Sequence, residues 1–205
     1  FVERKNLVLI SDEIYEAIVY GTSRHVSPAS LSDAIRARTI LVNSFSKTYA
    51  MTGWRVGYCA GPSELIQAMF LVLQQSSRGP ATFVQDAAIA ALRGSQTCVA
   101  EMRSEFVARR SLIGDALKDI PAVRVLLPEG GFFALVDVRQ LGRSSDEIRR
   151  RLLDESGVVV VHGAAYGRGG EGMLRVSFAS GGPTLARGLE LLKSGLLAIS
   201  QDRPV

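Results

Sequence analysis

The chain has 205 residues, of which 47% are hydrophobic and 21% are charged, and its formal net charge is +4. These values favour a globular protein with a substantial core and do not indicate nucleic-acid binding, because the charge is modest and the arginines are scattered. Charged residues or glycines interrupt every apolar run before the roughly 18 residues that a membrane span needs.

Cysteine and histidine usage gives no sign of a metal centre. Cys59 and Cys98 lie far apart, and His25 and His162 do not join them at zinc-ligand spacing. We therefore expect no metal and a reducing, cytoplasmic setting. The chain opens at Phe1 without a secretory signal pattern, and we interpret it as a fragment of a longer protein.

The first half of the chain alternates short apolar runs with helical patterns. Runs rich in β-branched residues predict three neighbouring strands, Leu7–Ile10, Thr39–Ser44 and Val56–Ala60. Apolar residues spaced three and four apart predict two helices, residues 62–75 and 82–92. This alternation predicts an α/β fold with a parallel or mixed sheet.

The second half mixes long helices with strands that pair locally. An amphipathic stretch over residues 97–120 leads to two runs, Val123–Leu127 and Phe132–Val138, which predict antiparallel strands joined by a turn. A capping box at residues 144–147 predicts a helix that ends at Gly157.

The last 50 residues complete an α+β pattern. The runs VVVV at 158–161 and MLRVSFA at 173–179 predict strands, and Thr184 opens a closing amphipathic helix. We place the domain boundary inside the long helix near residue 100. Residues 1–100 then form a partial α/β domain, and residues 101–205 form a smaller α+β domain.

A carboxylate and a phenol follow the first predicted strand, in the segment LVLISDEIYE. In open α/β sheets the carboxyl ends of the strands face the ligand crevice. A strand-to-turn transition at Asp12 would aim side chains three residues apart to one side, so we expect Asp12 and Tyr15 to share a site. Taken alone, Asp12 could equally be a turn cap and Tyr15 a packing residue.

The second predicted strand ends in NSFSK, which supplies Ser44, Ser46 and Lys47. A lysine in a partly desolvated crevice has its charged form disfavoured, and its neutral amine can form a Schiff base. Serine hydroxyls and the forked guanidinium of Arg55 suit a phosphate group. Individually, the serines are compatible with turn chemistry and Arg55 with a surface ion pair.

These groups together match what pyridoxal phosphate requires of a protein. A carboxylate keeps the pyridine nitrogen protonated as an electron sink, an amine holds the aldehyde, and hydroxyls with a guanidinium hold the phosphate. The side chains after the two strands therefore predict a pyridoxal phosphate site.

The run SFSKTYAMTGWRVGY, residues 44–58, resembles the lysine motif of the fold-type I, class I/II pyridoxal-phosphate-dependent aminotransferases, the aspartate and aromatic aminotransferase group. The similarity covers essentially the whole chain, from SDEIYE through SRGPATFVQDAA to GEGMLRVSFA. The chain is similar to the carboxyl-terminal half of that family. The resemblance implies part of the cofactor-binding large domain, with a mixed and mostly parallel sheet, over residues 1–100. It implies the small carboxyl-terminal domain over residues 101–205.

The resemblance also implies a role for each site residue. Asp12 would pair with the pyridine nitrogen, Tyr15 would hydrogen-bond the ring 3-oxygen, and Lys47 would carry the Schiff base. Three residues would bind the phosphate: Ser44, Ser46 and Arg55.

Arg175, in the run LRVSF, matches the arginine with which the family binds the substrate α-carboxylate. A bidentate guanidinium suits that task, and a charge on an apolar strand needs a partner. A structural ion pair at the edge of the core is the alternative for Arg175. We expect Tyr166 to border the substrate pocket.

The activity implied is transfer of an amino group from an amino acid to a 2-oxo acid. Lys47 would remove the substrate α-proton and return it to the cofactor, and a second oxo acid would reverse the sequence, giving ping-pong kinetics. Aspartate or an aromatic amino acid with 2-oxoglutarate is the substrate pair that the resemblance suggests. The family builds its sites across a homodimer interface, so we expect a homodimer with shared active sites.

The family's amino-terminal half has no counterpart in the chain. In the family that half brings a helix amino terminus for the phosphate, an aromatic residue stacked on the pyridine and an asparagine for the ring oxygen. Several sheet strands are missing with it, which leaves exposed edges. We therefore expect the isolated chain to be inactive.

Three other interpretations stay open at this point. The spacing of Ser44 and Lys47 also satisfies the S-x-x-K pattern of β-lactamases and penicillin-binding proteins, but SDA at 32–34 and KTY at 47–49 do not match the companion motifs. A pyridoxal-phosphate-sensing domain of a transcription regulator would share the fold. Lyases and cyclopropane-forming synthases would share fold and cofactor, and neither settles the reaction.

Overall fold

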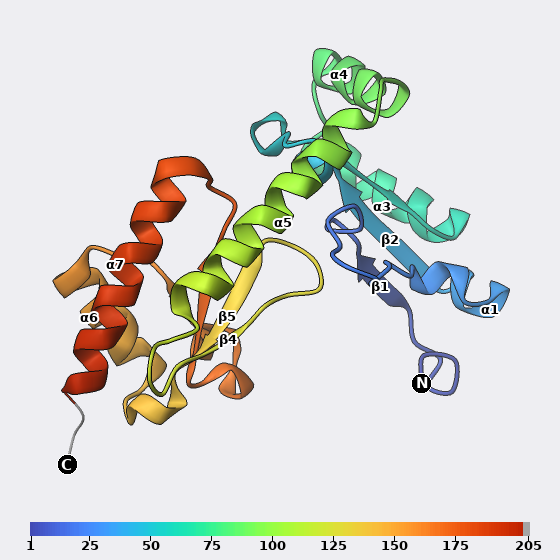
Figure 1. The fold of residues 1–205 in the computed structure, drawn as a ribbon. Coiled ribbons are helices and arrows are strands. Elements are labelled where there is room, and N and C mark those ends of the chain that lie inside the picture. The colour runs from blue at the N-terminus through green and yellow to red at the C-terminus, as the bar shows by residue number, and fades with distance from the viewer. Residues whose placement is uncertain (203–205) are drawn as a thin grey trace. The chain divides into compact units, whose positions relative to one another are not determined.

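The structure is a computed structural model that describes residues 1–202, and the chain divides into two compact units (Figure 1). Unit 1 is Phe1–Arg103 and unit 2 is Ser104–Val205. The division falls inside the long helix α5, Thr97–Leu117. Assignment of the units to the cofactor-binding and small domains of the family stays a prediction.

Unit 1 is built on a three-stranded mixed sheet with the order β1-β2-β3. Its strands are β1 (Leu9–Asp12), β2 (Thr39–Ser44) and β3 (Gly57–Ala60). β1 runs parallel to β2, and β3 runs antiparallel to β2. The three predicted strands are therefore neighbours in one sheet, as expected.

The first strand begins later than the sequence predicted. The backbone N–H of Leu7 donates to Val2 in an amino-terminal turn, whereas Leu9 donates to Arg38 and enters the sheet. The apolar run at 7–10 therefore overlaps the strand only in part, and the strand continues to Asp12.

Four α-helices and two 3-10 helices complete unit 1 before α5. They are η1 (Pro28–Ser30), α1 (Asp33–Arg36), α2 (Phe45–Thr48), η2 (Thr52–Trp54), α3 (Ser63–Ser76) and α4 (Thr82–Arg93). A small buried cluster joins the segment after β2 to α4, and its members are Phe45, Met51, Val56, Val84 and Ala88. This cluster packs under the segment that carries Lys47.

Unit 2 contains a four-stranded antiparallel sheet with the order β4-β5-β7-β6. Its remaining elements are β4 (Arg124–Leu126), β5 (Phe133–Asp137), η3 (Arg139–Leu141), α6 (Ser145–Ser156), β6 (Val161–His162), η4 (Gly163–Tyr166), η5 (Arg168–Gly170), β7 (Met173–Ser177) and α7 (Gly182–Gln201). Figure 1 shows α6 and α7 side by side, and these two helices contact one another. The predicted antiparallel pairing of the runs at 123–127 and 132–138 is confirmed.

The core of unit 2 follows from the alternation of its strands. Ala134 and Val136 of β5, with Leu174 and Val176 of β7, are buried on one face of the sheet. Apolar residues of α5, α6 and α7 are buried with them: Phe106, Ile113, Leu117, Ile148, Leu152, Leu189, Leu192 and Leu196. The opposite face of the sheet is left partly open.

The predicted caps of α6 are confirmed. The Ser144 hydroxyl accepts a hydrogen bond from the Glu147 backbone N–H, which satisfies one of the free donors at the helix start. Gly157 ends the helix in the left-handed conformation at φ 67°, where glycine carries no steric penalty.

The predicted strand VVVV at 158–161 is largely wrong, because only Val161 belongs to β6. Val158 and Val160 are buried while Val159 is 82% exposed, so burial alternates along the segment although residues 158–160 do not belong to β6. The Val158 N–H donates to Leu152 at the end of α6, which ties this residue to the helix and not to the sheet.

None of the helices within residues 1–202 combines the length and the apolar character that crossing a membrane requires.

Candidate functional site

The predicted site residues of unit 1 gather at one edge of its sheet. In the parallel pairing Asp12 lies beside Val42, so β1 and β2 end at the same edge, where Ser44 follows. The antiparallel strand β3 starts at this edge, because Gly57 pairs with Ser44. The register therefore brings together the Asp12 segment, the Ser44 segment and the residues just before β3.

A turn directly after β1 carries Asp12 and Tyr15. The Glu16 N–H donates to Glu13 and the Ile18 N–H donates to Tyr15, each through backbone carbonyls. The Asp12 carboxylate accepts from the Ile14 N–H at 3.3 Å. Asp12 is thus a turn cap, as the simpler interpretation held, and its exposed carboxylate can still accept a further donor.

Ser44 and Ser46 form a linked pair of hydroxyls at the end of β2. The Ser44 Oγ lies 2.8 Å from the Ser46 Oγ and accepts from the Ser46 backbone N–H at 3.0 Å. One turn of helix, α2, follows and places the half-buried Lys47 immediately after them. The predicted phosphate hydroxyls and the predicted nucleophile therefore share one local scaffold.

Arg55 joins this scaffold through an unusual backbone conformation. Its φ is 54° and its ψ is 49°, in the left-handed region that costs a non-glycine residue about 1–3 kcal/mol. Ala50, on the other side of η2, has a φ of 53°. Such strained residues occur preferentially at functional sites. The exposed guanidinium donates to the Thr52 carbonyl at 3.0 Å, and its other N–H groups can bind an anion.

Glycine is required where β3 meets β2. A Cβ added to Gly57 would lie 2.7 Å from the Asn43 carbonyl oxygen, closer than real Cβ contacts come. This close approach holds the segment from Arg55 to Gly57 against the end of β2, beside Ser44.

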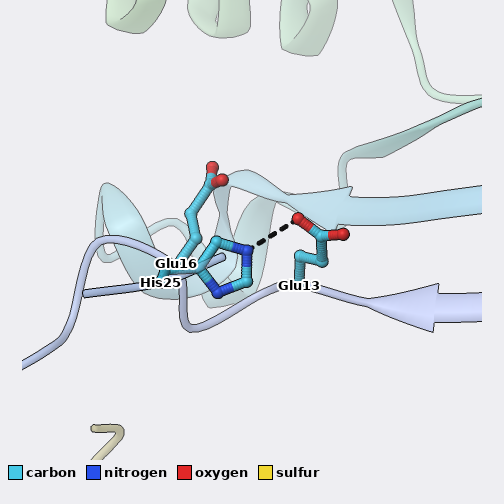
Figure 2. Close-up of side chains that lie close together, drawn as sticks. All are labelled: Glu13, Glu16 and His25. Atoms are coloured by element: carbon cyan, nitrogen blue, oxygen red, sulfur yellow. Dashed lines mark hydrogen bonds and ion pairs between the residues drawn. The ribbon is translucent and has the colours of Figure 1, made fainter. Parts of the chain in front are cut away.

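Glu13, next to Asp12, stabilises the turn that follows β1, and the sequence analysis did not single it out. Its carboxylate lies 2.7 Å from His25 Nε2 (Figure 2). It also accepts a hydrogen bond from the Ser27 hydroxyl at 2.7 Å. Burial disfavours the charged form of Glu13, but hydrogen bonds from Ser27, His25 and Ser11 outweigh burial and hold its pKa below the usual value. A buried, ionised carboxylate thus fastens the loop at 25–27 to the turn that carries Asp12 and Tyr15.

A second polar link joins this turn to β2. Asn43 Nδ2 donates to Glu16 Oε1 at 2.6 Å, and Asn43 Oδ1 accepts from the Ser44 N–H at 2.7 Å. Partial burial and the nearby Glu16 carboxylate raise the pKa of the Tyr58 phenol, against a hydrogen bond with Asn43. Asn43 therefore connects the two segments that carry the predicted site.

The ligand atoms of Glu13, Glu16 and His25 all lie within 4.8 Å of one another, which is metal-ligand spacing (Figure 2). The same atoms are used in hydrogen bonds: Glu13 with His25 and Ser27, and Glu16 with Asn43. Hydrogen bonding therefore accounts for the cluster. The expectation that the protein uses no metal stays a prediction.

Arg175 belongs to unit 2, whereas Asp12, Tyr15 and the 44–55 segment belong to unit 1. It lies on β7 opposite Leu135 of β5 and Val161 of β6. Its guanidinium carbon lies 4.3 Å from the ring centroid of Phe133 and 4.7 Å from that of Tyr166. Phe133 was not singled out by the sequence, although Tyr166 was.

The donors of unit 1 fit a phosphate ester and an aromatic aldehyde. The phosphate set consists of two adjacent hydroxyls and a guanidinium with free N–H groups, held at one sheet edge. A carboxylate, a phenol and an amine lie in the segments that follow the parallel strands β1 and β2. These are the groups with which a protein binds pyridoxal phosphate.

The family described as aminotransferase class I and II matches residues 1–188. The chain belongs to this family. Its mixed α/β fold agrees with that membership, and the predicted fold class and recognition are confirmed. Members of the class I and II aminotransferases generally depend on pyridoxal phosphate and are generally dimeric.

Similar proteins carry aminotransferase names. An aspartate aminotransferase of Pyrococcus abyssi is 39% identical over 200 residues, which are 96% of this chain and 50% of that protein. A probable aspartate aminotransferase of Methanocaldococcus jannaschii is 42% identical over 197 residues, 93% of this chain and 50% of that protein. The chain therefore spans about half the length of the curated relatives it matches.

Solved structures give the same picture. An aromatic aminotransferase from Pyrococcus horikoshii superposes with a TM-score of 0.91 at 39% identity, over 96% of this chain and 52% of that one. The aspartate aminotransferase from Rhizobium meliloti gives 0.90 at 33% identity, over 98% and 52%. These comparisons favour aminotransferases over the β-lactamase, regulator and lyase interpretations.

Proposed function

We propose that this chain forms half of a pyridoxal-phosphate-dependent aminotransferase, which transfers an amino group from an amino acid to a 2-oxo acid. The observation that carries the proposal is the register of unit 1. It ends β1 and β2 at one edge, so that the Asp12 turn and the Ser44–Lys47 segment meet there in a chain of the aminotransferase family.

Asp12 and Tyr15 would bind the ring of the cofactor. The exposed Asp12 carboxylate would accept a hydrogen bond from the pyridine N–H and so keep that nitrogen protonated. The Tyr15 phenol would hydrogen-bond the ring 3-oxygen. The buried Glu13 beneath the turn supports both roles, because it fixes the segment that carries them.

Ser44, Ser46 and Arg55 would bind the phosphate. Hydroxyls 2.8 Å apart can each reach an oxygen of one phosphate, and the guanidinium supplies paired donors. Charge-assisted hydrogen bonds of this type hold the cofactor in place while its aldehyde end reacts.

Lys47 would hold the aldehyde and move the proton. When bound, pyridoxal phosphate would supply an aldehyde that reacts with amines and a ring that accepts electrons. The Lys47 Nζ would exchange with the substrate amine, take the substrate α-proton as a base and return it as an acid.

Arg175 would bind the α-carboxylate that donor and acceptor substrates share. Aspartate or an aromatic amino acid with 2-oxoglutarate is the substrate pair we propose, since the relatives bear those names. The chain spans about half of those relatives, so we propose that the complete site forms in a homodimer of longer subunits and that this chain alone is inactive.

Covalent capture of the cofactor tests the proposal directly. The chain has four lysines, Lys5, Lys47, Lys118 and Lys193, so a labelled lysine is easily identified. The purified chain is incubated with pyridoxal phosphate, reduced with borohydride and mapped by mass spectrometry. We expect stoichiometric label on Lys47, no label there in Lys47→Ala, and unchanged label in Lys118→Ala.

Label spread evenly over the four lysines would contradict the capture of cofactor by this chain alone. The same experiment is then repeated with the amino-terminal half of the Pyrococcus abyssi aspartate aminotransferase added. Selective label on Lys47 only in the mixture would show that the other half completes the site. Even labelling in both experiments would refute the assignment of Lys47.

A further inference from the structure

Arg175 points to the open face of the unit 2 sheet. Its neighbours along β7, Leu174 and Val176, are buried on the core face, and alternation sends the guanidinium to the other side. The residues opposite it in the register are Leu135 and Val161. The charge therefore lies, half-buried, on a surface made largely of apolar side chains.

No acidic residue neutralises this charge within residues 1–202. The face of β5 that carries Leu135 also carries Asp137, but Asp137 already pairs with Arg139 at 2.6 Å and Arg124 at 3.4 Å. In the described chain the Arg175 guanidinium makes neither an ion pair nor a hydrogen bond. A partly desolvated cation without a partner favours an anion brought from outside.

Two aromatic rings hold the guanidinium instead. Phe133 lies two residues before Leu135 on the same face, and its ring centroid is 4.3 Å from the guanidinium carbon of Arg175. The Tyr166 centroid is 4.7 Å away. Ring faces attract a cation through their electron distribution, but they carry no charge. The N–H donors therefore stay available to a carboxylate.

Tyr166 lies in the loop from Gly163 to Gly170, whose two ends are in close backbone contact. At Gly163 an added Cβ would overlap the carbonyl oxygen of Gly170, and at Gly170 it would overlap that of Gly163. The two ends of the loop therefore touch backbone to backbone, which only glycine permits. This contact holds η4, and with it Tyr166, in a defined place beside β7.

We propose that Phe133 and Tyr166 are positioning residues that keep the Arg175 guanidinium oriented to receive the substrate carboxylate. The proposal rests on the role of Arg175 in the proposed function. Immobilising a long side chain costs about 0.5–1.5 kcal/mol on binding, and a ring that has already ordered it removes part of that cost. Loss of either ring should weaken carboxylate binding about 2- to 12-fold.

The test uses the whole 205-residue chain, ¹⁵N NMR of the arginine Nε–H groups and succinate as the probe. Arg175→Lys assigns the Arg175 signal. In the wild-type chain we expect this signal to be restricted on the ps–ns timescale, shifted by the two rings, and perturbed on titration with succinate. Phe133→Leu and Tyr166→Leu should free the signal and raise the succinate Kd, while Tyr166→Phe should leave both unchanged because it keeps the ring.

Three results would overturn the proposal. One is a mobile guanidinium in Tyr166→Leu with an unchanged succinate Kd. Another is succinate binding that survives in Arg175→Lys, and the third is a wild-type chain that does not bind succinate. Tyr166 is 62% exposed, so its replacement should leave the core intact. The Tyr166 variants therefore still test the proposal if the Phe133 variant does not fold.

Labelling of Lys47 separates this proposal from the proposed function, because Lys47 lies in unit 1 and Arg175 in unit 2. The Leu variants should label Lys47 as the wild type does. If succinate binding follows the rings while Lys47 captures no cofactor, even with the amino-terminal half of the relative added, the positioning role stands and the cofactor assignment fails.

Discussion

Unit 1 and unit 2 bury their apolar side chains very differently. Of the twelve largest fully buried side chains among residues 1–202, eleven belong to unit 2, and Ile18 alone belongs to unit 1. Sixteen of the 22 exposed large hydrophobic residues in the same range belong to unit 1. On α3 five consecutive residues are exposed, Met69 to Leu73. Unit 2 closes its own core, whereas unit 1 leaves apolar surface open.

We expect this difference to mark the part of the chain that depends on residues outside it. Extended apolar surface on a protein marks an interface. The relatives are about twice as long as this chain, and the predicted cofactor residues lie in the unit with the open surface. We therefore expect the remaining half of the family fold to cover unit 1 and to complete the site. Unit 2 should fold with or without it.

Hydrogen exchange should show the largest difference between the units. Amides of β5 and β7 should exchange at least about 100-fold more slowly than those of β1 and β2, because few buried contacts oppose opening of unit 1. The measurement is exchange followed by mass spectrometry on the 205-residue chain.

Adding the amino-terminal half of a relative provides the control for this experiment. Protection of β1 and β2 should then rise while that of β5 and β7 stays constant. Equal protection of the two sheets in the isolated chain would refute the comparison between the units.

A matched pair of leucine truncations tests the same difference at single residues. Leu196 on α7 is fully buried, and Leu71 on α3 is 65% exposed. Leu196→Ala should lower the free energy of unfolding by about 2–5 kcal/mol, because it removes buried surface and leaves a cavity. Leu71→Ala should change it by less than about 0.5 kcal/mol in the isolated chain.

Urea denaturation followed by circular dichroism measures both variants. If Leu71→Ala lowered the free energy of unfolding as much as Leu196→Ala, α3 would already be packed in this chain. The comparison in which unit 1 leaves apolar surface exposed would then be wrong.

Local sequence patterns were enough to predict most of the fold. β2 matches its predicted bounds, because a β-branched run there ends at hydroxyl residues, and α6 matches because its caps are short-range signals. The run at 158–161 failed because β-branched residues favour any extended backbone, whereas a strand needs a hydrogen-bonding partner. Leu7 failed because a local turn took its N–H.

The candidate site divides along the same line. Asp12, Tyr15 and the 44–47 segment were predictable because their motifs are short and follow strands. The supports of the site were not, because they join residues distant in sequence: Glu13 to His25 over 12 positions and Glu16 to Asn43 over 27. No local pattern encodes such pairs, and only the folded chain shows them. The catalytic and binding roles stay predictions.

Glu13→Ala tests whether one buried carboxylate fixes the turn of unit 1. The change leaves the Ser27 hydroxyl and the His25 ring without their acceptor, at a cost of about 1–3 kcal/mol. NMR shifts should change over residues 12–16 and 23–27. Glu13→Gln keeps an acceptor and should perturb them less.

The pH dependence of the Glu13 contribution has a definite sign. Its folded pKa lies below the usual value, so the contribution is present above the unfolded pKa and is lost as pH falls through the folded one. NMR shift changes in Glu13→Ala that are confined to the mutated residue would show that the turn does not depend on this carboxylate.

Asp137→Asn, in unit 2, should have a smaller effect than Leu196→Ala or Glu13→Ala. Hydrogen bonds from Arg139 outweigh burial and, with the charge of Arg124, lower the pKa of Asp137 from 3.8 to about 2. Because the folded pKa lies below the unfolded one, the stabilisation is complete above about pH 4 and disappears as pH falls to about 2. We expect a loss of about 1–2 kcal/mol at pH 7, reduced by solvent screening since Arg139 is 58% exposed.

Urea titrations at pH 7 and pH 2.5 should show that the stability difference between Asp137→Asn and wild type shrinks at the lower pH. Asp115→Asn, whose carboxylate is 71% exposed, should differ little from wild type at either pH. A constant difference for Asp137→Asn would mean that the lost stability comes from packing and not from charge.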